Sequence, residues 1–242
     1  MRIEPRRRLI LTAWGLVALF AAPAARGHID DPLLPEECGS CHVGHGMSGQ
    51  PMLDLAEEDF CYQCHGADEK RSAMVAEGRL SPAARPADVE REFAKAFRHP
   101  VKEGAGHAPD ERLPALSGSA VGHAECVDCH EPHQRRMAGR PQSRDVSGYS
   151  LSGQYLETSP NEYEICLKCH ADYLGFDRSE RRLQEEFALD VRSQHPVTRS
   201  ARPEKLPSLS GGVGRGTLMR CSDCHRSDDP SAPRGPHGSS HR

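Results

Sequence analysis

The chain has 242 residues, but only 36% of them are hydrophobic and 5% aromatic, while 22 are glycine and 19 are proline. So few apolar side chains exclude a large core built from the polypeptide alone, and without cofactors this composition is typical of a disordered chain. The formal net charge of −4 argues against a nucleic-acid partner and favours partners with a basic surface.

The first 24 residues have the three parts of a signal peptide. Four arginines precede an apolar run from Leu9 to Ala22, and the small residues Ala22 and Ala24 then offer a cleavage site. The alternative, an uncleaved membrane anchor, requires about 20 apolar residues, whereas this run has about 14. We therefore predict export to the periplasm, with the outer membrane or the cell surface as alternative locations. Cleavage after residue 24 leaves 27 basic and 34 acidic residues, so the mature chain has a net charge of −7.

Five copies of the pattern Cys-x-x-Cys-His follow, and together they use all ten cysteines of the chain. This pattern is the attachment signature of a c-type haem, because two thiols with this spacing add to the two vinyl groups of one haem. The next histidine is then placed to bind the iron as its proximal ligand. The sequence thus predicts five covalently bound haem c groups. Their attachment thiols are Cys38, Cys41, Cys61, Cys64, Cys126, Cys129, Cys166, Cys169, Cys221 and Cys224, and their proximal ligands are His42, His65, His130, His170 and His225.

Three other interpretations of the cysteines stay open at this point. The four cysteines from Cys38 to Cys64 have the spacing of a zinc ribbon, and ten cysteines in an exported chain also suit five disulfides. A thioredoxin-like redox motif needs a neighbouring βαβ unit, of which the sequence gives no sign. None of the three accounts for a histidine after every second cysteine, so haem attachment is preferred.

The chain after residue 24 is organised as a repeat. Cys-x-x-Cys-His-x-x-His occurs at 38–45 and 126–133, and each copy is followed by a second Cys-x-x-Cys-His, a charged amphipathic segment and His-Pro-Val. We predict a first doubled unit over 25–120, a second over 121–212 and a truncated third over 213–242, with two, two and one haems. An insert in the second unit at about 139–160, rich in Gly, Ser and Arg, is predicted to be an exposed loop.

The fold class follows from the same observations. Apolar residues at helical spacing predict one helix over Val89–Phe97 and another over Leu183–Val191, each ending at a His-Pro-Val segment because proline stops a helix. The haem macrocycles would supply the apolar interior that the side chains cannot. We therefore expect mostly irregular structure with a few short α-helices and little or no β, wrapped around five haems.

These motifs resemble the doubled C-x-x-C-H domain family of multihaem cytochromes c. The resemblance rests on Cys-x-x-Cys-His-x-x-His with its later partner motif, on His-Pro-Val and on the closing segment Gly235–Gly238, and it covers most of residues 38–240. Members of this family are mostly periplasmic or surface electron carriers, so the resemblance implies that role here. The third unit departs from the pattern, because Asp228 stands where the other first motifs are followed by a histidine.

Low-spin electron-transfer haems need a sixth iron ligand, and the histidines outside the five motifs are the candidates. Two of them follow a proximal histidine by only three residues, so we expect these two to reach a neighbouring iron. The predicted distal ligands, one per iron, are His45, His99, His133, His195 and His237. The reserve ligands are His28, which is the first choice among them, His107 and His123. Methionine ligation is the remaining alternative.

The predicted function is electron transfer, with no catalytic residues and no chemistry beyond the cycling of the irons between Fe(III) and Fe(II). Expected partners are redox proteins: a quinol dehydrogenase, a periplasmic cytochrome, a terminal reductase or an outer-membrane conduit. Peripheral membrane association and a homo-oligomer are further options. One alternative is a small multihaem reductase of a nitrogen or sulfur oxyanion, in which one haem, above all the fifth, has an open distal position. Another is a subunit of a haem filament or of a porin–cytochrome conduit.

Overall fold

The computed structural model of the protein describes residue 28 and residues 31–44, 52–102, 124–133, 146–171, 183–200 and 216–241. The predicted signal peptide and the candidate ligands His45, His107 and His123 lie outside these residues. Within them, no helix has the length and apolar character needed to cross a membrane.

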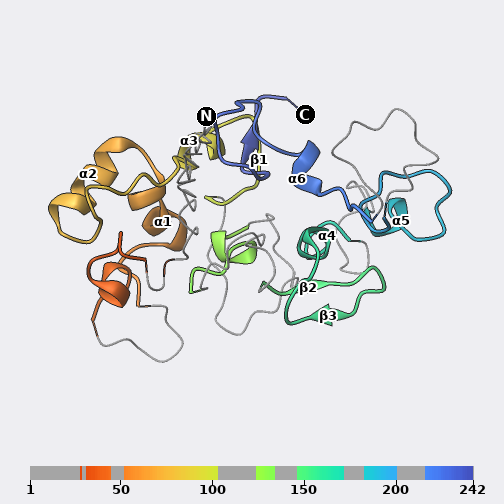
Figure 1. The fold of residues 1–242 in the computed structure, drawn as a ribbon, viewed down its shortest axis with the longest axis horizontal. Coiled ribbons are helices and arrows are strands. Elements are labelled where there is room, and N and C mark those ends of the chain that lie inside the picture. The colour runs from red at the N-terminus through yellow and green to blue at the C-terminus, as the bar shows by residue number, and fades with distance from the viewer. Residues whose placement is uncertain are drawn as a thin grey trace, which may run out of the picture.

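Short helical turns and strands of two residues alternate with long irregular connections (Figure 1). The helices and 3-10 turns are η1 (Glu37–Ser40), α1 (Glu57–His65), α2 (Asp68–Ala76), α3 (Glu90–Phe93), η2 (Cys126–Asp128), α4 (Glu162–Cys166), α5 (Leu183–Glu186) and α6 (Cys221–Cys224). The strands are β1 (Phe97–Arg98), β2 (Gly148–Tyr149), β3 (Tyr155–Leu156) and β4 (Gly238–Ser239). The described part of the chain thus confirms the prediction of a mostly irregular fold with few helices and little strand.

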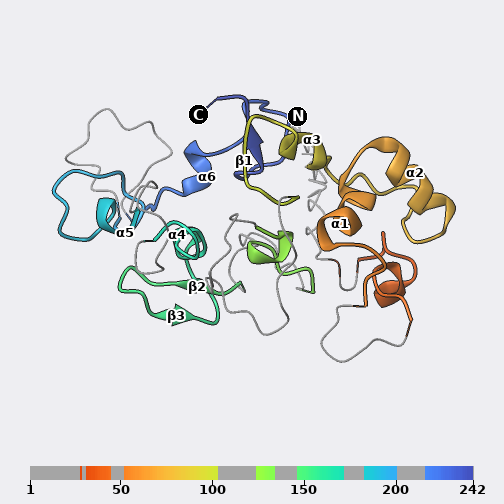
Figure 2. The ribbon, with the colours of Figure 1, turned by 180° about the vertical axis from the view of Figure 1, so that it is seen from behind.

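The elements are spread along one long axis in nearly the order of the sequence (Figures 1 and 2). Helices α1 and α2 lie at one end, α4 follows with strands β2 and β3 beyond the middle, and α5 lies at the other end. The C-terminal part breaks this order, because the chain returns to the middle after α6 and pairs β4 with β1. Such an extended order lets each motif lie beside the next one in the sequence.

Among the described residues, one apolar cluster lies beside α2. Met74, Leu80 and Ala84 are buried there, and Leu33 and Leu34, from the segment before the first motif, pack against them. A cluster of this size orders α2 against the first motif. It is too small to offset by itself the conformational entropy that the rest of the chain loses on folding.

Strand β4 brings the C-terminal segment onto the end of the first predicted unit. It pairs antiparallel with β1, with Gly238 opposite Arg98. Gly238 is buried, and a β-carbon on it would lie 1.9 Å from the carbonyl oxygen of Glu92. Only glycine allows the two backbones to approach this closely.

The insert of the second predicted unit contains a β-hairpin, so the prediction of an exposed loop over about 139–160 is wrong for the described part, 146–160. Strands β2 and β3 pair antiparallel, and Tyr149 packs against Tyr155 with 5.6 Å between ring centres. At the base of the hairpin, Val146 is 5% exposed and Ser159 is fully buried. The Gly and Ser content concealed this cross-strand aromatic pair, which is the kind of contact that stabilises a hairpin.

Both amphipathic helices are shorter than predicted. Helix α3 ends at Phe93, and the chain then extends into β1, where Phe97 is 44% exposed. Helix α5 is described over Leu183–Glu186, and Val191 lies in a separate turn, in which its N–H donates to the carbonyl of Ala188. In the first unit the reason is tertiary, because the pairing with β4 requires extended backbone where the apolar spacing favoured helix.

Candidate functional site

Each of the five motifs folds as a tight turn that places its histidine one helical turn after its first cysteine. In four motifs the histidine N–H donates to the carbonyl of the first cysteine at 2.8–3.0 Å, namely those of His42, His130, His170 and His225. The remaining motif, that of His65, lies within helix α1. Residues at i, i+3 and i+4 share one face of a helical turn, so the two thiols and the imidazole of a motif can face one planar group.

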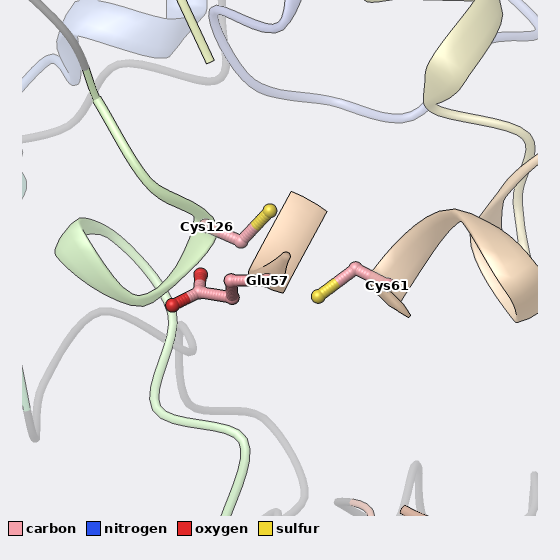
Figure 3. Close-up of side chains that lie close together, drawn as sticks. All are labelled: Glu57, Cys61 and Cys126. Atoms are coloured by element: carbon pink, nitrogen blue, oxygen red, sulfur yellow. The ribbon is translucent and has the colours of Figure 1, made fainter. Parts of the chain in front are cut away.

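The alternative interpretations of the cysteines find no support in the geometry. All ten thiols are free, so the structure contains none of the five disulfides. Among the described residues, one group of three metal-ligating side chains has its ligand atoms within 4.8 Å of one another, and it joins Glu57, Cys61 and Cys126 rather than the four cysteines of a zinc ribbon (Figure 3). These three side chains come from two different predicted units and mark a contact between them.

Glu57 joins the second motif of the first unit to the first motif of the second unit. Its carboxylate accepts a hydrogen bond at 2.9 Å from the N–H of Val127, the residue after Cys126. The thiols of Cys126 and Cys61 share a hydrogen bond, and this bond, followed by burial, raises the pKa of Cys126. Burial raises the pKa of Glu57 to about 7, from an ordinary value of 4.5, although the hydrogen bond from Val127 opposes the shift. The two motifs are therefore in direct contact.

The same contact recurs between the second and third units. Glu162 stands four residues before Cys166, as Glu57 stands before Cys61, and it accepts the N–H of Ser222 at 2.7 Å and the Ser222 hydroxyl at 2.8 Å. The thiols of Cys166 and Cys221 share a hydrogen bond, which is the largest cause of the raised pKa of Cys166. Neither glutamate was among the residues predicted from the sequence, although the pattern Glu-x-x-x-Cys before each second motif was the available signal.

Electrostatic contacts between other thiols extend these two junctions into a row. Burial, and then the charge of Cys41, raises the pKa of Cys64, so the two motifs of the first unit are neighbours. In the second unit, the charge of Cys129 adds to the hydrogen bond and the burial that raise the pKa of Cys166. The thiols of successive motifs are therefore in contact at the two junctions between units and within electrostatic reach of one another inside each unit.

Two proximal histidines face a second histidine ring in a nearly parallel arrangement. The ring centres of His42 and His133 are 5.9 Å apart, with 13° between the ring planes. Those of His130 and His237 are 6.0 Å apart, with 18° between the planes. The predicted distal ligands His133 and His237 therefore each lie opposite the proximal histidine of a first motif.

Two more proximal histidines face a ring that is tilted. The ring centres of His65 and His28 are 6.0 Å apart at 57°, and those of His170 and His99 are 6.2 Å apart at 65°. The predicted ligand His99 thus faces a second-motif histidine. So does His28, which the sequence offered only as a reserve.

The spacing within these pairs suits a metal ion between the two rings. A metal–imidazole bond is about 2 Å long and the ring centre lies about 1.1 Å beyond the nitrogen, so rings on opposite sides of one metal have centres about 6.2 Å apart. The observed separations of 5.9 to 6.2 Å agree with that distance. Two thiols for covalent attachment, with the imidazole that follows them and a facing imidazole as iron ligands, are also the groups that a six-coordinate c-type haem requires, so the residues fit this cofactor.

In three of the four pairs, one ring nitrogen already has an oxygen acceptor. The contacts are His65 Nδ1 to Ala87 O at 3.2 Å, His99 Nδ1 to Pro236 O at 2.8 Å and His133 Nδ1 to Glu131 Oε1 at 3.1 Å. An oxygen acceptor at Nδ1 fixes the proton on that nitrogen and leaves the lone pair on Nε2, as metal-binding histidines require.

Burial keeps His237 neutral near pH 7. Burial, followed by the nearby His130, lowers the pKa of His237 to about 4, and burial also lowers the pKa values of His65 and His130. The His237 ring packs edge-on against Phe93 with 5.5 Å between centres, and its Nδ1 is buried without a hydrogen-bond partner. A neutral imidazole is the form that binds iron.

The remaining candidate ligand within the described residues, His195, does not face a proximal histidine. It is exposed, while His45 lies outside the described residues. His225, the proximal histidine of the third unit, is also exposed, and no described histidine ring lies opposite it. His237, which was predicted as a ligand near this end of the chain, faces His130 instead.

A cluster of charged residues holds the C-terminal segment in place. Lys95 Nζ donates to the fully buried Glu92 at 2.6 Å, to Ser227 at 2.8 Å and to Asp228 at 2.9 Å. Asp228 also accepts the N–H of Ser240 at 3.2 Å, and the bonds from Lys95 and then Ser240 lower the pKa of Asp228. The third unit thus has an anchoring carboxylate where the other units have histidine. That departure from the repeat was the one sign of this cluster in the sequence.

Paired thiols, each pair followed by an imidazole, define a protein that binds c-type haem covalently. Residues 31–70, which hold the first two motifs, match the family model described as the doubled CXXCH motif. This match confirms the predicted resemblance to the multihaem cytochromes c over that part of the chain, and the doubled motif indicates a multihaem c-type cytochrome in electron transfer. Neither a curated protein nor a solved structure matches the chain.

Proposed function

We propose that this protein is an exported pentahaem c-type cytochrome that relays electrons between redox partners through closely spaced bis-histidine haems. The observation that carries the proposal is the row of motif thiols in chain order, with Cys61 in contact with Cys126 and Cys166 in contact with Cys221. Haems joined to thiols in contact must themselves be neighbours. An electron entering at one end of the row can then leave at the other in short steps.

The polypeptide attaches, orients and shields the cofactors. Ten thiols would hold five haems, and the histidine of each motif would bind the iron from one side. Bound haem supplies a one-electron Fe(III)/Fe(II) couple, so each electron taken from a reduced donor is passed to an oxidised acceptor and no bond is made or broken. Histidine on the other side, in place of methionine, favours low reduction potentials.

The proposed location is the periplasm, after cleavage of residues 1–24, with the outer membrane or the cell surface as the alternatives. The proposed partners are a quinol dehydrogenase, a periplasmic cytochrome, a terminal reductase or an outer-membrane conduit. Because the mature chain has 34 acidic and 27 basic residues, a partner with a basic docking face is favoured.

The test is to produce the full chain in a host that attaches haem c. The intact mass should equal the mature chain plus five haems, and the reduced protein should pass electrons to a small basic cytochrome c, faster at low ionic strength than at high. A mass equal to that of the bare polypeptide would contradict the cofactor assignment. A five-haem protein that exchanges no electrons with the basic cytochrome would contradict the relay.

A second candidate function is the reduction of a nitrogen or sulfur oxyanion at the fifth haem. The observation that favours it is the position of His237 opposite His130, which leaves His225 without a facing histidine among the described residues. Electron paramagnetic resonance of the oxidised protein would then contain a high-spin ferric signal, and reduced viologen dye would be consumed with nitrite, hydroxylamine or sulfite. Low-spin signals alone, with no turnover of these anions, would exclude this candidate.

A further inference from the structure

The contacts between successive predicted units repeat. The glutamate before each second motif binds the N–H after the first cysteine of the next unit, at 2.9 Å from Glu57 and 2.7 Å from Glu162. The His-Pro-Val segments repeat as well, because the carbonyl after each of their histidines accepts an N–H two residues before the next first motif. These bonds are Pro100 O with Ala124 N–H at 3.4 Å and Pro196 O with Met219 N–H at 2.8 Å. Each unit is thus placed on the next in the same way.

The four facing histidine pairs obey a rule that follows this repeat. The ring opposite a first-motif histidine comes from the following unit: His133 faces His42, and His237 faces His130. The ring opposite a second-motif histidine comes from the stretch of chain that precedes the first motif of that unit, which for the second unit is the end of the first unit. His28 faces His65 in this way, and His99 faces His170.

We propose that the units interlock through their irons. Each first-motif iron takes its sixth ligand from the following unit, and each second-motif iron takes it from the segment that precedes the first motif of its unit. The axial pairs are His42 with His133, His65 with His28, His130 with His237 and His170 with His99. This pairing rests on the proposed pentahaem function and deepens it, because it assigns particular ligands to four of the five irons.

The third unit keeps the rule even though Asp228 replaces histidine after its motif. Asp228 binds Lys95, and β4 pairs with β1, so the C-terminal segment is fixed on the first unit and carries His237 to His130. The residue before it, Pro236, offers its carbonyl to His99 Nδ1 at 2.8 Å. The same segment therefore supplies one axial ligand and orients a second.

The two kinds of pair differ in ring orientation, so the haems they bind should differ in their electron paramagnetic resonance signals. In low-spin ferric haem, nearly parallel axial imidazoles give a rhombic signal, whereas rings close to perpendicular give a highly anisotropic signal with a large maximal g value. The first-motif pairs are nearly parallel, at 13° and 18°, and the second-motif pairs are tilted, at 57° and 65°. Oxidised protein should contain two haems of each class among these four.

The test removes single ligands and records which class of signal disappears from the five-haem protein. His133→Gly and His237→Gly should each convert one rhombic signal to high spin, while His28→Gly and His99→Gly should each remove one highly anisotropic signal. Added imidazole should restore the low-spin state in each variant while the signals of the other haems stay unchanged, a combination that a misfolded protein would not give. His241→Gly is the matched control for His237→Gly, because His241 is exposed and faces no proximal histidine, and its spectrum should be unchanged.

A variant that lacks the fifth haem distinguishes the proposed pairing from the alternative in which His237 binds the iron of its nearest motif, that of His225. In a chain with Cys221→Ala and Cys224→Ala, which lacks the fifth haem, His237→Gly should still produce one high-spin signal, because His237 serves the iron of His130. An unchanged spectrum there would overturn the pairing. Loss of a highly anisotropic signal in His133→Gly, or of a rhombic one in His28→Gly, would overturn it too. A colourless parent protein would instead contradict the proposed function, so the two failures are distinguishable.

Discussion

The ring of His237 lies almost parallel to that of His130, with 6.0 Å between centres, although the proximal histidine nearest to it in the sequence, His225, is only twelve residues away. The preceding residue, Pro236, supplies the carbonyl that accepts His99 Nδ1. A short C-terminal segment thus orders histidines that face motifs in the second unit. Disturbing the backbone of this segment should therefore affect haems far from it along the chain.

Gly238→Ala is the smallest such disturbance. The added β-carbon would lie 1.9 Å from the carbonyl oxygen of Glu92, so β4 must move away from α3. We expect a loss of about 1–3 kcal/mol in the free energy of unfolding, measured by guanidinium denaturation of the haem-loaded protein. Gly39→Ala is the matched control, because its β-carbon meets nothing closer than 3.5 Å. Equal stability of the two variants would contradict the close packing of β4.

Protein made without haem attachment should not fold. The buried apolar cluster around Met74 and Leu80 is small, and the described chain is mostly irregular, so side-chain burial alone cannot offset the conformational entropy. The full chain expressed in a host that lacks haem-attachment enzymes should give a disordered far-ultraviolet circular dichroism spectrum and should be cleaved rapidly by protease. The haem-loaded chain from the same gene is the control. A protease-resistant apoprotein would show that the polypeptide has a sufficient core of its own.

The motifs and their local turns could be predicted because they depend on residues close together in sequence. The spacing of Cys126, Cys129 and His130 sets the turn by itself, and the low apolar content correctly indicated an irregular fold. The partner of each proximal histidine depends on long-range contacts, and sequence spacing does not carry that information. His28 was therefore only a reserve, and the position of His237 opposite His130 depends on the binding of Asp228 to Lys95. The β2–β3 hairpin was missed for a related reason, because its stabilising contact joins two strands.

Asp128 is a spacer residue of the third motif, yet it should contribute to stability. Its carboxylate accepts the N–H of Glu125 at 2.8 Å, which caps the turn η2 that holds Cys126. Asp128→Ala leaves that N–H without its partner and should cost about 1 kcal/mol in the free energy of unfolding. Asp128→Asn, which keeps an acceptor oxygen, should lose much less. The comparison is made by denaturation of the haem-loaded proteins, and an equal loss in both variants would assign the effect to charge instead of capping.

Glu57 should give the protein a stability that falls as the pH rises towards neutrality. Burial raises the pKa of this carboxyl from 4.5 to about 7 in the folded state. The folded chain therefore binds a proton at a pH where the unfolded chain has released it. The resulting stabilisation is fully present below about pH 4.5 and is lost as the pH rises through about 7.

Glu57→Gln cannot ionise and keeps an oxygen for the Val127 N–H, so its free energy of unfolding should decline less between pH 5 and pH 8 than that of the parent protein. Glu69→Gln, on the exposed side of α2, serves as the control and should follow the parent. Parallel curves for the parent and Glu57→Gln would mean that the carboxyl at the junction with Cys61 and Cys126 ionises as freely in the folded protein as in the unfolded chain.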